Sequence, residues 1–502
     1  MGAFAELSSE EVTALSHLGQ PGWADRFGER PRLLLGWVAL ALGAGLVTGV
    51  ATAALSPLYA VAAALGLLAA AALLASTQAG LLAFVVVVAL LPFAVVPLQL
   101  GLVKLTLLDF VLVALLLVWL GRLLTSPGER LRAGSLGGLV LAFIVLALVS
   151  FAAGTAYAIT AETTRLFLKI VNSVLLYFTV LNCVRARRQL EQLVAALVIA
   201  GAAAAALGLV LYFLPAATAT ALLSSLRPLG YPGGDVLRYI ADTTVQRAIG
   251  TAIDPNILGA LLMLAAAVAV GQAVSPRPVL DRRLILSLLV PLIAGLLLTY
   301  SRSSWMGLAA AAMFVGTLRY RRLWLAFLLV AVALYLGILP QGEGFVGHLQ
   351  SGLEARDQAS AMRLGEYRDA LRLIGQYPWF GVGFGVAPDV DLYIGVSSIY
   401  LLLAEQMGLV GLAAYLLAVG TVLWRALRVL LAERPEPDVD ALLLGTTAAF
   451  VAALTAGVFD HHFVNLRFPH VVGLFWLLAG LTMVGVRLAR QGHDTGAKDE
   501  VT

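Results

Sequence analysis

Apolar stretches of about 20 residues follow one another along almost the whole chain, and they constrain its fold more than any other feature. A helix of that length spans the hydrocarbon core of a bilayer. Hydrophobic residues make up 61% of the 502 residues and charged residues only 12%, against about 25% charged in soluble proteins. The short alternating segments that are typical of outer-membrane barrels are absent from the sequence. The sequence therefore predicts an all-α polytopic membrane protein.

The same stretches predict about fourteen transmembrane helices. Their expected ranges are 33–54, 57–75, 79–98, 105–124, 136–154, 164–183, 192–214, 254–274, 284–300, 303–318, 323–340, 397–424, 441–459 and 469–487. Two of them are short, and the region 57–98 could also hold a re-entrant element, so twelve or thirteen spans remain possible. The single cysteine, Cys183, excludes an internal disulfide framework and a cysteine-rich metal site. The polar segment that precedes the first apolar run does not have the pattern of a cleavable signal peptide.

Basic residues gather in seven clusters of three, two of them near the chain termini and five at connections between the expected helices. The clusters are Arg26, Arg30 and Arg32; Arg122, Arg130 and Arg132; Arg185, Arg187 and Arg188; Arg277, Arg282 and Arg283; Arg319, Arg321 and Arg322; Arg425, Arg428 and Arg434; and Arg487, Arg490 and Lys498. Lysine and arginine accumulate in cytoplasmic loops, so these connections and both chain termini are expected inside.

This orientation divides the chain into three parts. We expect a cytoplasmic N-terminal segment (1–32), a transmembrane domain (33–487) and a cytoplasmic tail (488–502). Two long loops, 215–253 and 341–396, then lie outside, and the larger one connects helices 11 and 12. A loop of that length is too long to be a passive connection.

Several arginines fall near the outer ends of helices, where the same rule predicts few. Arg302 interrupts the apolar run "LTYSRSSWMGL" (298–308), and Arg247 and Arg363 lie in the two outer loops. The planar guanidinium fork pairs with phosphate through two hydrogen bonds, so these arginines could hold a pyrophosphate at the headgroup level. Alternatively, such arginines reach lipid headgroups or pair with carboxylates, and Arg368 and Arg372 are equally consistent with a solvated helix face.

Acid–base candidates on the outer side are few. "FDHHF" places Asp460, His461 and His462 at the outer end of helix 13, where a histidine beside a carboxylate could act as a general base. Asp389 and Asp391 are the next choice, and Glu366 and Asp369 are further options. Asp389 and Asp391 belong to the sequence "PDVD" (388–391), which recurs at 437–440 on the inner side. Such a repetition is typical of an ordinary loop sequence. Adjacent histidines point in different directions on a helix, so we predict no metal site.

Four segments, in this order, resemble motifs of the O-antigen ligase/polymerase superfamily. They are "RAIGTAIDPNILG" (247–259), "LTYSRSSWMGL" (298–308), "MRLGEYRDALRLIGQYPWFGVGFG" (362–385) and "SSIYLLLAEQMGLVGLAAYL" (397–416). The resemblance covers about residues 240–480, whereas the N-terminal half is similar only as a stack of helices. It departs from the family pattern at Tyr367, where tryptophan is usual, and at Ser397 and Ser398, where histidine and asparagine are usual.

The resemblance implies glycan transfer from an undecaprenyl-pyrophosphate carrier to an acceptor sugar outside the cytoplasmic membrane. It implies a fold similar to the C-type glycosyltransferases, with no metal and no other cofactor. The implied partners are the lipid-linked glycan donor, a glycan or lipid-linked acceptor and the bilayer, with no nucleic acid. The resemblance implies that Arg302 and Arg247 hold the donor pyrophosphate. The other substrate-binding candidates are Arg363, Ser301, Ser397 and Tyr400.

Three functions remain open at this stage. A serine at position 397 removes the histidine that is the usual candidate base of ligases, which favours an inverting polymerase of surface-polysaccharide repeat units. The alternative is an O-antigen ligase that moves a finished glycan to a lipid or protein. A flippase of lipid-linked sugars is a third class, but it should place charges near the bilayer midplane in two repeated halves. Here the charges gather at the outer end of the second half.

Overall fold

The computed structural model describes ten stretches of the chain. They are residues 76–100, 103–125, 131–132, 134–153, 160–234, 236–240, 243–335, 358–384, 396–433 and 435–499. All of them belong to one unit, Ser76–Thr502. The expected helices 33–54 and 57–75 and the N-terminal segment 1–32 lie outside the described residues.

Helices account for most of the described residues. In chain order they are α5 (Thr77–Leu90), α6 (Leu107–Thr125), α7 (Gly134–Ala153), α8 (Ala161–Cys183), α9 (Arg187–Phe213), α10 (Ala216–Ser224), α11 (Pro255–Val274), α12 (Arg282–Leu298), α13 (Arg302–Leu318), α14 (Arg322–Tyr335), α16 (Gln358–Gln376), α17 (Ile399–Arg428), α18 (Pro437–Phe459) and α19 (Pro469–Asp499). Every helix expected from residue 79 onward has a counterpart among them.

Eight of the described helices are long and apolar enough to cross a membrane. They are Leu107–Thr125, Leu136–Ala153, Ala161–Cys183, Arg187–Phe213, Pro255–Val274, Ile399–Glu433, Pro437–Phe459 and Pro469–Gln491. The prediction of an all-α polytopic membrane protein is therefore confirmed at this level.

The expected helix 79–98 is wrong in its second half. Helix α5 ends at Leu90, and strands β1 (Val95–Leu100) and β2 (Val103–Thr106) follow as an antiparallel hairpin. Pro92 and Pro97 explain the change, because proline has no N–H for the helix ladder and disfavours helical backbone in the residue before it. The apolar composition of this segment hid the boundary.

The interior of the bundle is built around α11, α18 and α19, most of whose membrane-length residues are buried. Aromatic side chains fill the space between these helices and α17. Phe475 of α19 lies with its ring centroid 5.1 Å from Phe450 of α18 and 5.5 Å from Phe463. This packing holds Phe463, and with it the preceding 460–462 segment, against the rigid centre of the bundle.

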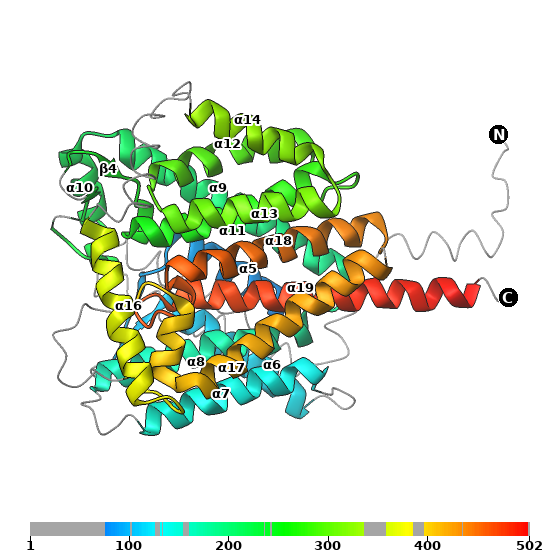
Figure 1. Cartoon of the computed structure of the whole chain (residues 1–502), viewed down its shortest axis with the longest axis horizontal. Coiled ribbons are helices and arrows are strands. Elements are labelled where there is room, and N and C mark those ends of the chain that lie inside the picture. The colour runs from blue at the N-terminus through cyan, green and yellow to red at the C-terminus, as the bar shows by residue number, and fades with distance from the viewer. Residues whose placement is uncertain are drawn as a thin grey trace, which may run out of the picture. The chain divides into compact units, whose positions relative to one another are not determined.

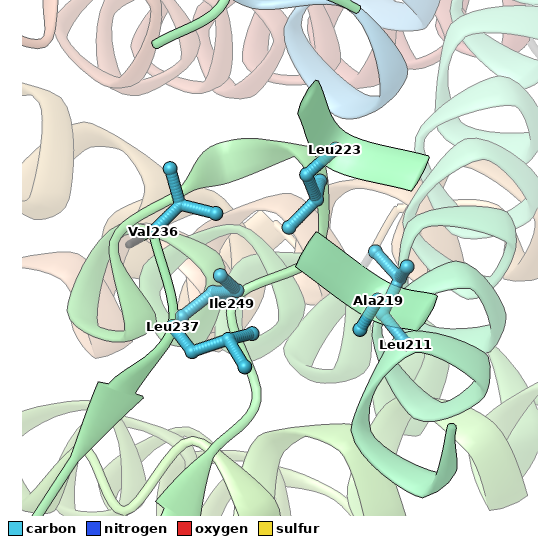
Figure 2. Close-up of a cluster of buried hydrophobic side chains, with 6 residues drawn as sticks. All are labelled: Leu211, Ala219, Leu223, Val236, Leu237 and Ile249. Carbon is cyan, nitrogen blue, oxygen red and sulfur yellow. The ribbon is translucent and has the colours of Figure 1, made fainter. Parts of the chain in front are cut away.

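The segment 215–253 forms a small folded cap with its own core. It contains α10, the hairpin of β3 (Arg238–Tyr239) with β4 (Gln246–Arg247), and two short 3-10 helices, η2 (Arg227–Leu229) and η3 (Gly250–Ala252). Figure 2 shows the buried cluster that joins the cap to the end of α9: Leu211, Ala219, Leu223, Val236, Leu237 and Ile249. In Figure 1, α10, β4 and α16 all lie at the left end of the helices that cross the view.

The opposite ends of several helices meet in ion pairs. Asp438, in the first turn of α18, pairs with Arg187 at 2.8 Å and with Arg277 at 3.6 Å. Asp440 pairs with Arg319 at 2.9 Å. The "PDVD" at 437–440 therefore does more than an ordinary loop sequence, because it joins arginines from three of the expected inner clusters at one end of the bundle.

Helix α17 is broken at Gly408, where the backbone adopts φ 68° and ψ −177°. The turn 378–383, which follows α16, fills the break. Four main-chain hydrogen bonds join the two: Leu409 N–H to Pro378 O at 2.7 Å, Val382 N–H to Glu405 O at 2.8 Å, Gly383 N–H to Gln406 O at 2.9 Å and Val410 N–H to Trp379 O at 3.4 Å. A Cβ atom at Gly408 would lie 2.2 Å from the carbonyl carbon of Trp379, so only glycine fits there.

Candidate functional site

The N-terminus of α11 organises one side of the site. Asp254 caps this helix, because its Oδ1 accepts hydrogen bonds from the N–H groups of Asn256 at 2.8 Å and Ile257 at 3.1 Å. Pro255 occupies the first helical position, where its missing N–H has no consequence. The "DPN" segment is thus a helix start that the sequence specifies locally.

Arg247 joins β4 to both neighbouring segments. Its Nε donates to the carbonyl oxygen of Thr299 at 2.8 Å, and its Nη2 donates to the side-chain oxygen of Asn256 at 2.6 Å. The N–H of Ala248 also donates to the carbonyl of Leu298 at 2.8 Å. Arg247 is therefore part of the framework of the site as well as a source of positive charge.

Three serines lie buried in the turn that begins α13. The hydroxyl of Ser301 lies 3.0 Å from that of Ser304 and 3.3 Å from that of Ser303. Gly259 of α11 packs against this turn so closely that a Cβ atom there would lie 2.9 Å from the Cβ of Ser301. The close contact fixes Arg302, the first residue of α13, relative to α11.

The charged groups of this region act on one another. The pKa of Arg247 falls to about 10, first because burial disfavours the charged guanidinium. Asp254 and Asp460 oppose that fall, whereas the guanidinium groups of Arg363 and Arg302 add to it. The three arginines that the sequence singles out thus lie within electrostatic range at one end of the bundle.

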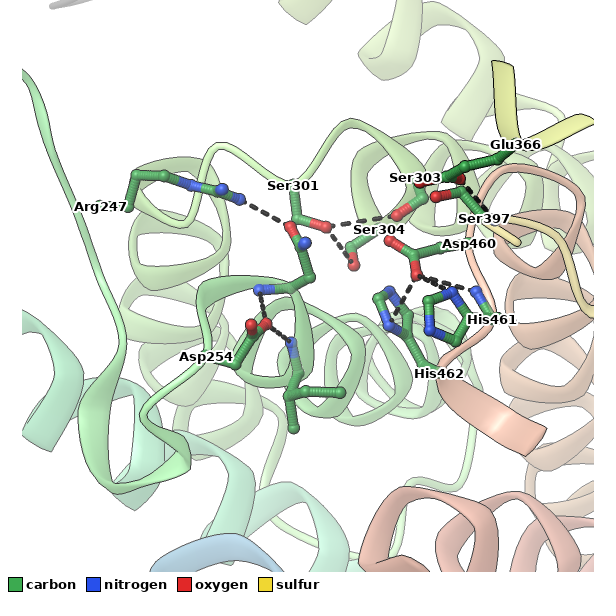
Figure 3. A network of polar contacts seen from close by, with 12 residues as sticks. Arg247, Asp254, Ser301, Ser303, Ser304, Glu366, Ser397, Asp460, His461 and His462 are labelled. Atoms are coloured by element: carbon green, nitrogen blue, oxygen red, sulfur yellow. Dashed lines mark hydrogen bonds and ion pairs between the residues drawn. The ribbon is translucent and has the colours of Figure 1, made fainter. Parts of the chain in front are cut away.

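Asp460, His461 and His462 form a second group after the end of α18 (Figure 3). Asp460 Oδ1 accepts the main-chain N–H of His461 at 2.8 Å and lies 3.1 Å from Nδ1 of His462. His461 Nδ1 is farther away, at 3.5 Å. The side chain of His461 is 22% exposed, against 4% for His462 and 8% for Asp460. The Nε2 atom of His462 is buried and has no hydrogen-bond partner among the described residues.

The protonation of this group follows from its surroundings. Burial alone would raise the pKa of the Asp460 carboxyl, but His462, His461 and Arg363 together hold it below its ordinary value. Burial lowers the pKa of His462, and this effect outweighs the opposing attraction of Asp460. At neutral pH the arrangement is a carboxylate beside a neutral imidazole, which can accept a proton.

Helix α16 brings Arg363 and the Ser397 turn to the same place. The charge of Arg363 acts on both Asp460 and His462. One helical turn further along, the hydroxyl of Tyr367 donates to the carbonyl oxygen of Ser397 at 3.0 Å, and Glu366 Oε2 accepts the N–H of Ser397 at 2.9 Å. Two of the three departures from the family pattern, Tyr367 and Ser397, are therefore in direct contact.

Tyr400 takes part in a contact between two helices. The hydroxyl of Tyr400 donates to the carbonyl of Leu454 in α18 at 2.9 Å, so it joins two helices. Asp389 and Asp391 lie outside the described residues. Sequence reasoning missed Asp254, Asn256 and Thr299. Only the helix-start pattern Asp-Pro-Asn carried a signal for the first two, and none marked the Thr299 carbonyl.

One family of known proteins is similar to part of the chain. Residues 287–416 match the family model described as O-antigen ligase. The resemblance to the O-antigen ligase/polymerase superfamily is thereby confirmed over a segment that contains Arg302, Arg363 and Ser397, whereas Arg247 and Asp460 lie outside it.

The chain was also compared with curated protein sequences and with solved structures. No curated protein sequence matches the chain. A solved structure described as "Structural coordination of polymerization and crosslinking by a peptidoglycan synthase complex" aligns with 18% sequence identity and a TM-score of 0.37. That alignment covers 70% of this chain and 96% of the other.

Proposed function

We propose that the protein is an inverting, metal-independent glycosyltransferase that polymerises repeat units of a surface polysaccharide carried on undecaprenyl pyrophosphate. It lies in the bacterial cytoplasmic membrane with about fourteen spans in a C-type glycosyltransferase-like fold. Both termini are cytoplasmic, and the loops 215–253 and 341–396 face outward. The observation that carries the proposal is the grouping of Arg247, Arg302 and Arg363 beside the Asp460 and histidine cluster.

In this reaction the acceptor hydroxyl oxygen attacks the anomeric carbon of the donor sugar from the face opposite the pyrophosphate. The bond between that carbon and the phosphate oxygen breaks, and its electron pair stays on the departing pyrophosphate. The guanidinium groups stabilise the charge that develops there. The hydroxyl proton passes to a base, for which we favour the cluster of Asp460, His461 and His462. Ser301, Ser397 and Tyr400 complete the proposed substrate-binding set, and Asp389 and Asp391 remain the alternative bases.

Transfer of a finished glycan is the second candidate, because the matching family model is described as O-antigen ligase. The two reactions differ in their products. Membranes that contain this protein, supplied only with a lipid-linked repeat unit, should form a ladder of longer lipid-linked glycans if it is a polymerase. A ligase should form product only when a separate acceptor lipid or protein is added.

The phosphate role can be tested at Arg302. Arg302→Ala should lower product formation by about 100-fold, because one preorganised charge on the leaving group is lost. Arg302→Lys should also be poor, since an ammonium cannot reproduce two parallel hydrogen bonds. Arg368→Ala, on the exposed face of α16, is the control and should keep wild-type turnover. Wild-type activity in Arg302→Ala, with normal membrane insertion, would exclude the pyrophosphate role.

A further inference from the structure

Two neighbouring side chains of α16 hold both polar main-chain groups of a single residue. Glu366 Oε2 accepts the N–H of Ser397 at 2.9 Å, and the Tyr367 hydroxyl donates to the carbonyl of Ser397 at 3.0 Å. Figure 3 shows the hydrogen bond between Glu366 and Ser397. Such a two-sided contact leaves the backbone at this point little freedom to rotate or shift.

This contact at Ser397 affects the position of α17, because the N-cap of that helix is the next residue. The N-cap of α17 is Ser398, whose side chain makes no capping hydrogen bond. The N–H of Ser398 donates to the carbonyl of Val396 at 2.7 Å, so the chain turns tightly here. The side chains of α16 thus provide the fixation that the helix start itself lacks.

The other end of α16 is also attached to α17. There, the turn 378–383 fills the break at Gly408 through main-chain hydrogen bonds. Between Glu366 and Pro378, α16 and its turn span about 18 Å at about 1.5 Å per residue. Two attachment points this far apart fix both the position and the direction of α16.

Arg363 lies one helical turn before Tyr367, so both project from the same side of α16. The charge of Arg363 acts on Asp460, His462 and Arg247, which come from other parts of the chain. Any rotation of α16 would therefore move a cation relative to the rest of the site.

We propose that Glu366 and Tyr367 are positioning residues, which hold α16 on Ser397 so that Arg363 stays beside Asp460 and the other arginines. This inference rests on the proposed function, since it assigns Arg363 to donor binding. Burial raises the pKa of the Tyr367 phenol, so its hydroxyl keeps the proton that it donates.

Four variants separate this role from simple stability. Glu366→Ala removes the acceptor, whereas Glu366→Gln keeps an oxygen in its place. Tyr367→Phe removes only the donor hydroxyl. Arg368→Ala changes an exposed residue of the same helix and is the matched control. Turnover is measured in membranes with the lipid-linked repeat unit, and hydrogen–deuterium exchange is measured on peptides that contain Ser397.

Glu366→Ala and Tyr367→Phe should each raise KM for the donor by about 10-fold, with a smaller change in kcat, because a misplaced Arg363 weakens donor binding in the ground state. Glu366→Gln should restore a nearly wild-type KM. Exchange of the Ser397 amide should be faster in Glu366→Ala and unchanged in Arg368→Ala. The proposal is overturned if donor KM stays at the wild-type value in both disruptive variants.

The exchange measurement keeps the inference distinct from the proposed function. If the wild-type protein forms no glycan from the lipid-linked donor, the proposed function is wrong, and no KM can be compared. If the Ser397 amide exchanged as slowly in Glu366→Ala as in the wild-type protein, that result by itself would overturn the positioning role. Faster exchange of the Ser397 amide in Glu366→Ala than in the wild-type protein would support the fixation of α16 on Ser397, without any assumption about the substrate.

Discussion

At the scale of single residues, Arg247 combines structural hydrogen bonds with a positive charge at the candidate site. Its hydrogen bonds to Thr299 and Asn256 join the cap hairpin to the α13 turn and the α11 start. Replacing it by alanine would therefore disturb geometry as well as charge. Arg302 and Arg363 carry the other two positive charges that act on Arg247, so alanine variants at these two positions are further probes of phosphate binding.

The lowered pKa of His462 predicts that the folded protein is less stable at acidic pH. Its pKa is lowered by burial in the folded protein, so the unfolded chain binds more protons at mildly acidic pH. The stability that follows is fully present above the ordinary histidine pKa of about 6.5 and is lost as pH falls below it. Asp460, whose pKa is also lowered, acts in the same direction at lower pH.

Thermal unfolding of the purified protein in detergent should therefore show a melting temperature that decreases between pH 7.5 and pH 5. His462→Gln removes the titrating imidazole but keeps a donor, and its melting temperature should decrease less over the same interval. Parallel curves for the two proteins would show that His462 does not carry the effect.

At the scale of elements, the break in α17 and the turn that fills it form one unit. Gly408→Ala should destabilise the protein by more than about 1 kcal/mol, because its φ of 68° and its contact with Trp379 both exclude a side chain. Gly420→Ala is the matched control in the same helix, since an added Cβ there meets nothing within 4 Å. It should be neutral or slightly stabilising, because alanine favours helix more than glycine does.

The two glycine variants can be compared by their melting temperatures in detergent. We expect a clear decrease for Gly408→Ala only. An equal response of the two variants would mean that the break contributes nothing specific to stability.

The elements differ in how well the sequence predicts them. Apolar length located the helices from residue 79 onward because lipid imposes a fixed span. It missed the β1–β2 hairpin, whose residues are equally apolar, and the break in α17, which depends on contacts with a distant turn. For the site, the sequence indicated which arginines and histidines to consider. It could not show that Tyr367 holds Ser397, because that contact joins α16 to a turn beyond it in the chain.

At the scale of the whole molecule, the ion pairs of Asp438 and Asp440 lie at one end of α18, and the candidate site lies beyond its other end. Asp438 and Asp440 join arginines of three clusters at the start of α18, while Asp460 follows the end of the same helix. This separation is what the positive-inside rule predicts for a site that faces outward. The orientation itself remains a prediction.

Cysteine labelling tests that orientation. In a background with Cys183→Ser, Thr244→Cys in the cap and Ala432→Cys after α17 both lie at exposed positions. In intact cells, an impermeant thiol reagent should label Thr244→Cys and should reach Ala432→Cys only after the membrane is opened. The reverse pattern would invert the topology.

The turn 378–383 is synthesised before the break in α17 that it fills. It precedes Gly408 in the chain, so it has already left the ribosome when the broken part of α17 emerges. Main-chain groups exposed at a break in a membrane-spanning helix find no partner in lipid. Here their partner is made first, and the nascent chain can complete α17 without waiting for any later segment.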